Sequence, residues 1–449
     1  MSNLAKVPFL TGVRRLFYLV SVNESSFKDV EEVPLYINEA TPFFFVCMFL
    51  EMAVMWYKKD KQIRFNDGAT SLFAGQYSRF PIILGLTSFS FTGYVWVYDN
   101  YNIYELPWDS AWTWWLCFLA VDFAFYWFHR LAHEVNFMWA AHQVHHSSEY
   151  CNLTTALRQS VLQIYTSWVF YLPLALFIPP SIFMVHNELN ILFQFWIHTQ
   201  FIKSLGPLEY ILNTPSHHRV HHGRNPYCID KNYAGTLIIW DRLFGTFQAE
   251  DEEVVYGLTH PINTFDPNVI QFGCLKYMIE RFSEVKGWKN KLRVVFCGPG
   301  WAPGKPRTGD INDIPVVKAP WPQYHMNLPS WVSVYAAVHF TLELFYYQEV
   351  TARSAGLSQL SILLFLLHIG FCLTCFGKIF DNDPSAPQYE LLRCFLTLCG
   401  DVALCHYGFY GAPGYRPTFV IFLQAVFMFS LCVWSSVIYN TVTKTKKVD

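Results

Sequence analysis

Histidine is the residue type in this sequence whose number and spacing best suggest chemistry. Of the 16 histidines in the 449-residue chain, five fall in residues 129–146, which read HRLAHEVNFMWAAHQVHH, and four fall in residues 217–222, which read HHRVHH. Neutral imidazole is a common protein ligand for zinc, copper and iron. The two segments are therefore the first candidates for a metal site.

The spacing within the two segments groups the imidazoles on helix faces. His129 and His133 are four residues apart, which places them on one face of an α-helix. Two HxxHH patterns follow, and in a helix the three histidines of each pattern also share a face. The eight histidines of these boxes are His129, His133, His142, His145, His146, His218, His221 and His222. One divalent ion takes about three or four such ligands, so eight ligands favour two ions.

Three other interpretations of the histidines are weaker. A lone histidine on an apolar face is usually an ordinary core residue, as we expect for His339, His368 and His406. Three boxes of closely spaced histidines, which the topology argued below places on one side of a membrane, are not explained in this way. A storage tract is disfavoured because about seventy residues separate the boxes. The HExxH motif of zinc proteases begins at His133 but fails, because residue 137 is Phe.

The composition is that of a membrane protein. Hydrophobic residues make up 53% of the chain, aromatic residues 18% and charged residues only 15%, against about 25% charged residues in soluble domains. The net charge of −2 gives no basic field for nucleic acid. The 12 cysteines are scattered, and the CxxC at 372–375 lies in an apolar run, where we expect buried free thiols.

Apolar runs predict the helices that span the membrane. They cover residues 41–56, 81–98, 111–128, 331–347, 357–376, 389–407 and 417–439, and residues 161–202 form a further apolar stretch interrupted by Pro173 and Pro179–Pro180. We expect this stretch to be a membrane hairpin that brings the second histidine segment back to the side of the first.

Charged residues orient these spans. The basic segment 58–64 should be cytosolic, so the N-terminus is lumenal and all three boxes lie at the cytosolic face. The span count also returns the C-terminus to the cytosol, where Lys446 and Lys447 resemble the dilysine signal for retrieval to the endoplasmic reticulum. We therefore predict an all-α, multi-pass protein of the endoplasmic reticulum membrane with its active site facing the cytosol.

Three regions follow from this organisation. Residues 1–110 hold a lumenal segment and the first two spans, residues 111–328 hold the histidine boxes in a catalytic domain, and residues 329–449 form a C-terminal block of four transmembrane helices. The stretch 298–322 is rich in proline and glycine and is predicted to be a loop.

Several motifs resemble the fatty acid hydroxylase superfamily, the histidine-box membrane oxygenases. They are the three boxes, Asp122, Tyr126–Arg130 (YWFHR), Asn213–Pro215 (NTP), Asp230–Tyr233 (DKNY) and Trp240–Phe247 (WDRLFGTF). Within that superfamily the chain looks most like the alkylglycerol monooxygenase family. Its boxes follow three spans, a long Pro/Gly-rich segment and four more spans come after them, and no cytochrome b5-like domain is fused to it.

The resemblance implies a di-iron centre, molecular oxygen as co-substrate and tetrahydrobiopterin as reductant, with no pterin-binding residues identified. It also implies hydroxylation of the alkyl carbon next to an ether oxygen, which gives a hemiacetal that breaks down to a fatty aldehyde and a glycerol lipid. The lipid is expected to enter from the bilayer. Because ligand imidazoles must be neutral, we expect activity to fall below about pH 6.5.

The resemblance also assigns residues. The metal ligands are the eight histidines above, with His198 as a ninth candidate and His217 as a second choice to His218. Glu134 is the candidate catalytic residue, either orienting a histidine or accepting a proton, with a solvated surface glutamate as the alternative. Asp122, two helical turns before His129, is either a functional acid or a packing residue.

Two other functions stay open. One is a sterol or sphingolipid hydroxylase or desaturase that takes electrons from cytochrome b5. The other is a non-enzymatic metal-binding membrane protein or transporter, against which the boxes cluster at one face and no chain of ionisable residues crosses the spans.

Overall fold

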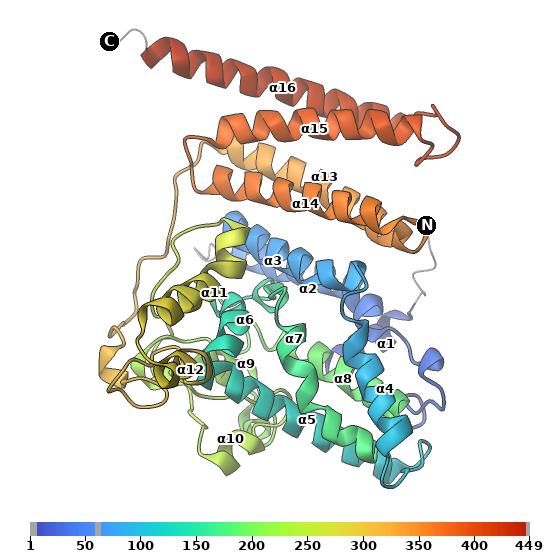
Figure 1. Cartoon of the computed structure of the whole chain (residues 1–449), viewed down its shortest axis with the longest axis vertical. Coiled ribbons are helices and arrows are strands. Elements are labelled where there is room, and N and C mark those ends of the chain that lie inside the picture. The colour runs from blue at the N-terminus through green and yellow to red at the C-terminus, as the bar shows by residue number, and fades with distance from the viewer. Residues whose placement is uncertain (1–6, 59–63, 446–449) are drawn as a thin grey trace. The chain divides into compact units, whose positions relative to one another are not determined.

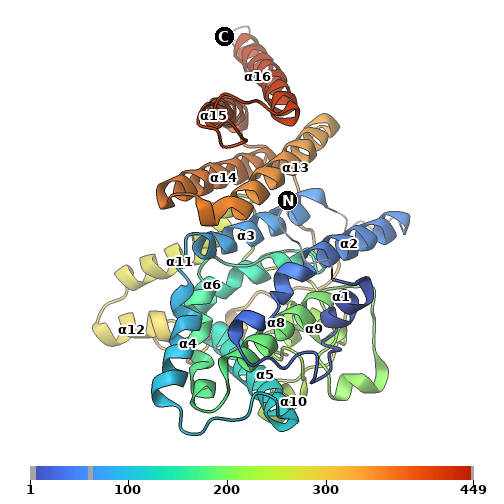
Figure 2. The same cartoon turned by 90° about the vertical axis from the view of Figure 1, so that its right-hand side faces the viewer.

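The protein is all-helical, as predicted. The computed structural model describes residues 7–58 and 64–445, and within these ranges the only β-type pairings are two isolated bridges. The chain forms two compact units (Figures 1 and 2). Unit 1 comprises residues 1–263 and 269–324, and unit 2 comprises residues 264–268 and 325–449.

Unit 1 contains most of the helices and all three histidine boxes. Its helices are α1 (Phe9–Leu16), α2 (Tyr36–Tyr57), α3 (Phe65–Ile83), α4 (Ser88–Tyr101), α5 (Ala111–Glu134), α6 (Asn136–His146), α7 (Ile164–Ser167), α8 (Pro180–Trp196), α9 (Pro215–His221), α10 (Ile239–Phe244), α11 (Pro267–Glu284, whose first two residues belong to unit 2) and α12 (Trp288–Phe296). Unit 2 contains α13 (Ser330–Arg353), α14 (Gln359–Phe380), α15 (Ala386–His406) and α16 (Thr418–Thr445).

Four helices among the described residues are long and apolar enough to cross a membrane. They lie in Val30–Tyr57, Ala111–Glu134, Gln359–Phe380 and Thr418–Asn440, and they contain four of the predicted spans almost completely. The helices at the predicted spans 331–347 and 389–407 are long enough but do not reach the same apolar composition. They carry Glu343, Glu390, Arg393 and Asp401 inside. The chain is a multi-pass membrane protein.

The predicted span 81–98 is not one continuous helix. The helix stops at Ile83, the chain turns through Gly85 at a φ of +70°, and α4 starts at Ser88. Together α3 and α4 are apolar enough for one span, but they are bent by 55°. A glycine with positive φ ends a helix readily, so the sequence GLTS divides what hydropathy reads as one run.

Only the second half of the predicted hairpin at 161–202 is a regular α-helix. Residues 164–176 form a short α-turn followed by 3₁₀ turns, and Pro173 lies in the second of these turns. Pro180 is the first residue of α8, where its missing N–H costs no hydrogen bond. Buried α8 residues, including Val185, Leu189 and Phe193, pack in one core with residues of α1 and α2.

A single extended residue separates the two helices of the first histidine segment. Val135 has φ −129° and ψ 117°, which ends α5 and starts α6. The turn is held from outside, because the backbone N–H of Asn136 donates to Cys297 O at 2.8 Å and its side-chain amide donates to Val294 O at 2.8 Å. The break lets α6 fold back on α5, so the second box faces the first.

Candidate metal centre

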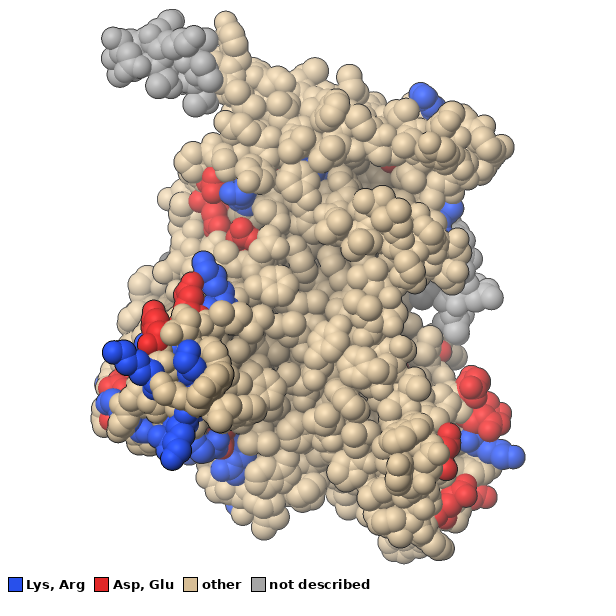
Figure 3. Space-filling model, in the orientation of Figure 1, with Lys and Arg blue, Asp and Glu red and all other residues tan. Residues whose placement is uncertain are grey.

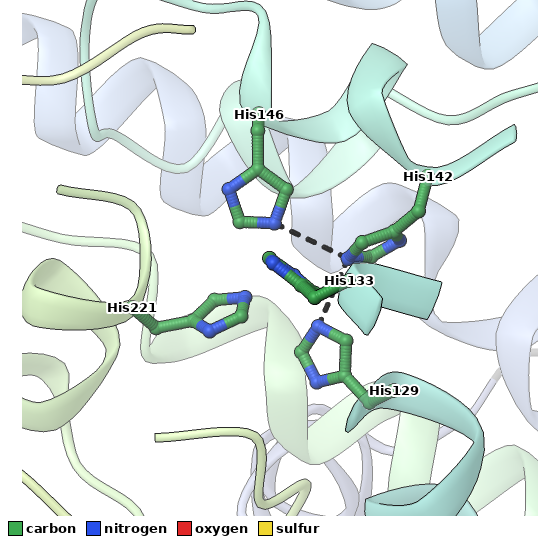
Figure 4. A group of neighbouring side chains, drawn as sticks. All are labelled: His129, His133, His142, His146 and His221. Atoms are coloured by element: carbon green, nitrogen blue, oxygen red, sulfur yellow. Dashed lines mark hydrogen bonds between the residues drawn. The ribbon is translucent and has the colours of Figure 1, made fainter. Parts of the chain in front are cut away.

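Nine buried histidines form two adjoining groups in unit 1. His129, His133, His142, His146 and His221 make up the five-histidine cluster (Figure 4), and His145, His198, His218 and His222 make up the four-histidine cluster. Within each cluster, one nitrogen of every ring lies within 4.8 Å of the others. The clusters adjoin through His146 and His222, whose rings stack with centroids 4.5 Å apart.

Four elements supply these rings. α5 provides His129 and His133 one turn apart, α6 provides the HxxHH of the second box, and α9 with its C-cap provides the third box. His198 follows the end of α8. The adjacent residues 145 and 146 point into different clusters, as do 221 and 222. Each HxxHH box therefore contributes to both sites.

Backbone carbonyls orient four of the nine rings. The Nδ1 atoms of four histidines lie 2.7–3.2 Å from carbonyl oxygens: His129 from Tyr233, His145 from Arg158, His198 from Gln194 and His221 from Lys231. His142 instead places Nδ1 3.2 Å from the side-chain oxygen of Gln163. A ring that donates from Nδ1 has its lone pair on Nε2, which is the tautomer a metal ligand needs.

The Nε2 atoms converge without suitable partners. His129 Nε2 is 2.9 Å from His142 Nε2, and His218 Nε2 is 2.8 Å from His198 Nε2. In the His129–His142 pair both rings have Nδ1 directed at an oxygen atom, so Nδ1–H donation would direct two lone pairs at one another. The Nε2 atoms of His133 and His221 are buried with no hydrogen-bond partner. Buried acceptors in this arrangement fit metal cations, and the donor set of nitrogen ligands suits iron, zinc or copper.

Burial keeps the rings neutral. Desolvation lowers the pKa of His142 to about 4 and that of His221 to about 3, from an ordinary value of 6.5. The pKa values of His145, His146, His218 and His222 are also far below 6.5, because burial and neighbouring imidazoles both oppose protonation. The expected loss of neutral ligands near pH 6.5 is therefore moved to lower pH in the folded protein.

Asp122 is a packing residue that ties α5 to the segment after the third box. Its fully buried carboxylate accepts hydrogen bonds from the Asn190 side chain, from the backbone N–H groups of Thr236 and Leu237, and from Trp240 Nε1, at 2.7–2.9 Å. Four donors saturate one carboxylate, which leaves no lone pair for chemistry. Of the two roles considered for Asp122, the geometry supports the structural one.

The DKNY and WDRLFGTF motifs act on His129 through the backbone. Asp241 accepts from the N–H groups of Tyr233 and Ala234 at 2.8 Å and from Thr246 Oγ1 at 2.7 Å. This fixes the backbone at Tyr233, whose carbonyl faces His129 Nδ1. These residues position a ring without touching the centre.

Arg158 and Asp67 support the second box, and sequence reasoning missed both. The Arg158 guanidinium is 3.0 Å from Asp67 Oδ1 and donates from Nε to Ser147 Oγ at 2.9 Å, while Arg158 O faces His145 Nδ1. The ion pair is almost fully buried. Neither residue belongs to a recognised motif, and 91 residues separate them in the sequence.

Of the remaining predicted site residues, some lie in the histidine clusters and others lie outside them. His198 lies in the four-histidine cluster, whereas His217 packs its ring against Phe247 and lies outside both clusters. The Glu134 carboxylate pairs with Arg130 and Arg307. The carboxylate nearest a clustered ring is that of Asp230, with Oδ1 3.8 Å from His133 Nδ1. Asp230 entered the sequence reasoning only as part of a motif.

Comparison with known proteins places this site in a family. The fatty acid hydroxylase pattern matches residues 114–246, which confirms the predicted superfamily, and the alkylglycerol monooxygenase C-terminal domain matches residues 332–413. Human (Homo sapiens) alkylglycerol monooxygenase is 55% identical over 388 residues, covering 86% of this chain and 87% of that protein. This chain belongs to the alkylglycerol monooxygenase family.

More distant members of the family agree over almost the whole length. The alkylglycerol monooxygenase of Danio rerio is 51% identical over 428 residues, covering 94% of each chain, and that of Caenorhabditis elegans is 37% identical over 453 residues, covering 95% of this chain and 88% of its own. No solved structure matches the chain significantly. The family relationship therefore extends over both units.

Proposed function

We propose that this protein is an ether-lipid monooxygenase that hydroxylates the alkyl carbon next to the ether oxygen of an alkylglycerol. The hydroxylated product is a hemiacetal, which breaks down to a fatty aldehyde and a glycerol lipid. The observation that carries the proposal is the pair of adjoining histidine clusters at the end of a membrane-spanning helix, in a chain related to alkylglycerol monooxygenases over nearly its full length.

Two iron ions, one for each cluster, would supply oxygen activation, with tetrahydrobiopterin as the reductant. The five-histidine cluster would hold one ion and the four-histidine cluster the other. The chain itself contributes the fixed tautomers: carbonyls accept from Nδ1 and so leave Nε2 free to bind. Burial of all nine rings excludes bulk water from the centre and keeps competing protons off the ligands.

The helix that carries the first box also supports access from the bilayer. Trp115, Leu119 and Phe123 lie four residues apart on α5, and their side chains are exposed. In a span, such a stripe faces lipid tails. A long alkyl chain can lie along this stripe with its ether group toward the histidines at the end of α5. The proposal therefore explains why the centre is built at a helix end.

The site residues are assigned on the same basis. We propose the nine clustered histidines as iron ligands and leave His217 out. For Glu134 we propose a positioning role: its ion pairs with Arg130 and Arg307 hold the end of α5, one residue after His133. For Asp230 we propose an electrostatic role, because its Oδ1 lies 3.8 Å from His133 Nδ1, beyond direct hydrogen-bond distance.

We further propose that the protein resides in the endoplasmic reticulum membrane and that its metal centre faces the cytosol. The support is in the sequence: the basic segment 58–64 and the terminal Lys446 and Lys447. Residues 59–63 and 446–449 lie outside the described residues. Protease protection of tags placed in the loop at 314–317 and at the C-terminus, in sealed microsomes, tests this topology.

The decisive experiment supplies membranes containing the protein with an alkylglycerol, oxygen and tetrahydrobiopterin, and measures the fatty aldehyde. We expect aldehyde that requires the pterin. His218→Ala should abolish it, while the adjacent His217→Ala and the unit 2 variant His368→Ala should retain it. Turnover of sterols or sphingolipids with cytochrome b5 and without pterin would assign the chain to the other oxidase class. Iron-loaded protein with no turnover of any of these lipids would contradict an oxygenase function.

A further inference from the structure

The outer face of α12 combines an apolar stripe with a basic stripe. Trp288, Leu292 and Phe296 follow one another at intervals of four residues and are 75%, 53% and 55% exposed. Lys289 and Arg293 are also exposed and lie beside this stripe on the helix, about 100° to 140° around the axis from Trp288. The opposite face is anchored in the protein through Val294, which packs in a core with Met278 and Trp301.

The basic side chains on this face are not neutralised within the described residues. The glutamates of the neighbouring helix α11 pair with cations of α11 itself, Lys276 with Glu280 and Arg281 with Glu284. Lys286, Lys289 and Arg293 form no ion pair with any described residue, and the Arg293 guanidinium lies 6.0 Å from the centroid of the Trp301 ring. Figure 3 shows Lys and Arg side chains over this corner of unit 1, with Asp and Glu side chains among them. The surface therefore offers unpaired positive charge next to exposed aromatic and aliphatic side chains.

The position of α12 is set by the end of a membrane span. α5 is a span candidate that ends at Glu134, and two residues later Asn136 donates both its backbone N–H and its side-chain amide to carbonyls at the C-terminal end of α12. The rings of Phe137 and Phe296 are also in contact, with centroids 5.7 Å apart. α12 is therefore fixed at the level where α5 leaves the bilayer.

We propose that α12 is an interfacial helix that lies on the anionic lipid surface of the membrane on the histidine side of α5. An apolar stripe flanked by lysine and arginine is the pattern of helices that lie in the headgroup plane, with the apolar stripe toward the acyl chains and the cations at lipid phosphates. Trp288 fits this position, because indole rings concentrate at membrane interfaces. A soluble protein partner would not explain why α12 lies beside the end of a membrane span.

The contact has a consequence for the metal centre. Asn136 lies between His133 and His142 in the sequence, at the junction of α5 and α6, and its two hydrogen bonds to α12 hold that junction. Lipid binding at α12 thus stabilises the turn on which the first two histidine boxes depend.

Photocrosslinking of the full-length protein in lipid nanodiscs tests the proposal. A benzophenone amino acid replaces Leu292 in one variant and Asn290, about 160° away on the same helix, in the matched control. Adducts are identified by mass spectrometry in phosphatidylcholine with and without phosphatidylserine. We expect lipid adducts at position 292, at most a fifth of that yield at 290, and a higher yield with phosphatidylserine.

Charge variants complete the test. In phosphatidylserine discs, Arg293→Gln should lower the yield at position 292 by up to about fivefold, whereas Arg293→Lys should retain it. Retained iron content and an unchanged elution profile identify the variants that are folded. Equal adduct yields at 290 and 292, adducts to a second protein chain instead of lipid, or a yield that does not respond to phosphatidylserine would each overturn the proposal.

Discussion

The Nε2 atoms of His129 and His142 lie 2.9 Å apart although each ring has its Nδ1 directed at an oxygen atom. In the neutral tautomer this arrangement sets two lone pairs against each other inside a dry cluster. Such an arrangement costs free energy unless a cation lies between the rings. A metal ion bound by both Nε2 atoms would remove this unfavourable interaction.

Metal should accordingly stabilise the fold. We expect purified protein to contain about two iron ions per chain, and chelation to lower its melting temperature. A ligand at about 100 times its Kd contributes roughly 2.7 kcal/mol. His142→Ala should reduce both the iron content, measured by mass spectrometry, and the stabilisation by added Fe²⁺. His217→Ala is the matched control, and an equal loss in both variants would show that the cluster assignment is wrong.

The stability of the metal-free protein should depend on pH. Folded His142 and His221 have pKa values of about 4 and about 3, whereas the unfolded side chains have the ordinary value near 6.5. The unfolded chain therefore binds more protons between these limits. The contribution of these rings is complete above pH 6.5 and is lost as the pH falls toward 4, by up to about 1.4 kcal/mol per pH unit for each ring.

Thermal unfolding of the chelated protein at pH 7.5, 6.5 and 5.5 measures this dependence. We expect a melting temperature that falls with pH, and a shallower fall for His142→Gln, which removes one titrating ring. His325 is exposed in unit 2, so His325→Gln should keep the wild-type slope. A melting temperature that rises toward pH 5.5 would show that the clustered rings are already protonated in the fold.

The histidine boxes were predictable because ligand spacing and helix periodicity are local. HxxxH and HxxHH place rings on helix faces before any tertiary contact exists, and the structure keeps these faces. The sharing of each HxxHH box between two clusters depends instead on how α6 and α9 approach each other, and these helices are about seventy residues apart in the sequence. No local pattern encodes it.

Hydropathy predicted the uninterrupted spans but did not predict where backbone geometry breaks a helix. The run at 81–98 contains no charged residue, but Gly85 takes a positive φ and divides it. The side-chain partners of Glu134 could not be predicted from the sequence either. Glu134 directly follows a clustered histidine, but its carboxylate pairs with Arg307, which is 173 residues later in the chain. Distant partners of this kind can be read only from the folded chain.

The buried pair of Arg158 and Asp67 offers a test of the support behind the second box. Arg158→Met removes the guanidinium and leaves Asp67 without its ion-pair partner, which should cost about 3–5 kcal/mol. The double variant Asp67→Asn with Arg158→Met removes both charges and should recover part of that loss. Denaturant unfolding measures the cost, and additive losses in the double variant would contradict a coupled pair.

Unit 2 contains a second buried ion pair, and variants of this pair can test whether fold stability and metal binding are independent. Arg393 and Glu390 on α15 form an ion pair that is almost completely inaccessible, and Arg393 also donates to His339 Nδ1 at 2.9 Å. His339 in turn contacts Ser430 of α16 at 2.9 Å. The network thus connects α13, α15 and α16 through polar groups within an apolar bundle.

Arg393→Met should destabilise unit 2 by about 3–5 kcal/mol, because Glu390 would remain charged and buried without its partner. The double variant with Glu390→Gln should be more stable than Arg393→Met alone. Since the nine clustered histidines all lie in unit 1, iron bound per folded chain should stay at the wild-type value in both variants. Loss of iron in proportion to the destabilisation would instead mean that the two units fold as one cooperative structure.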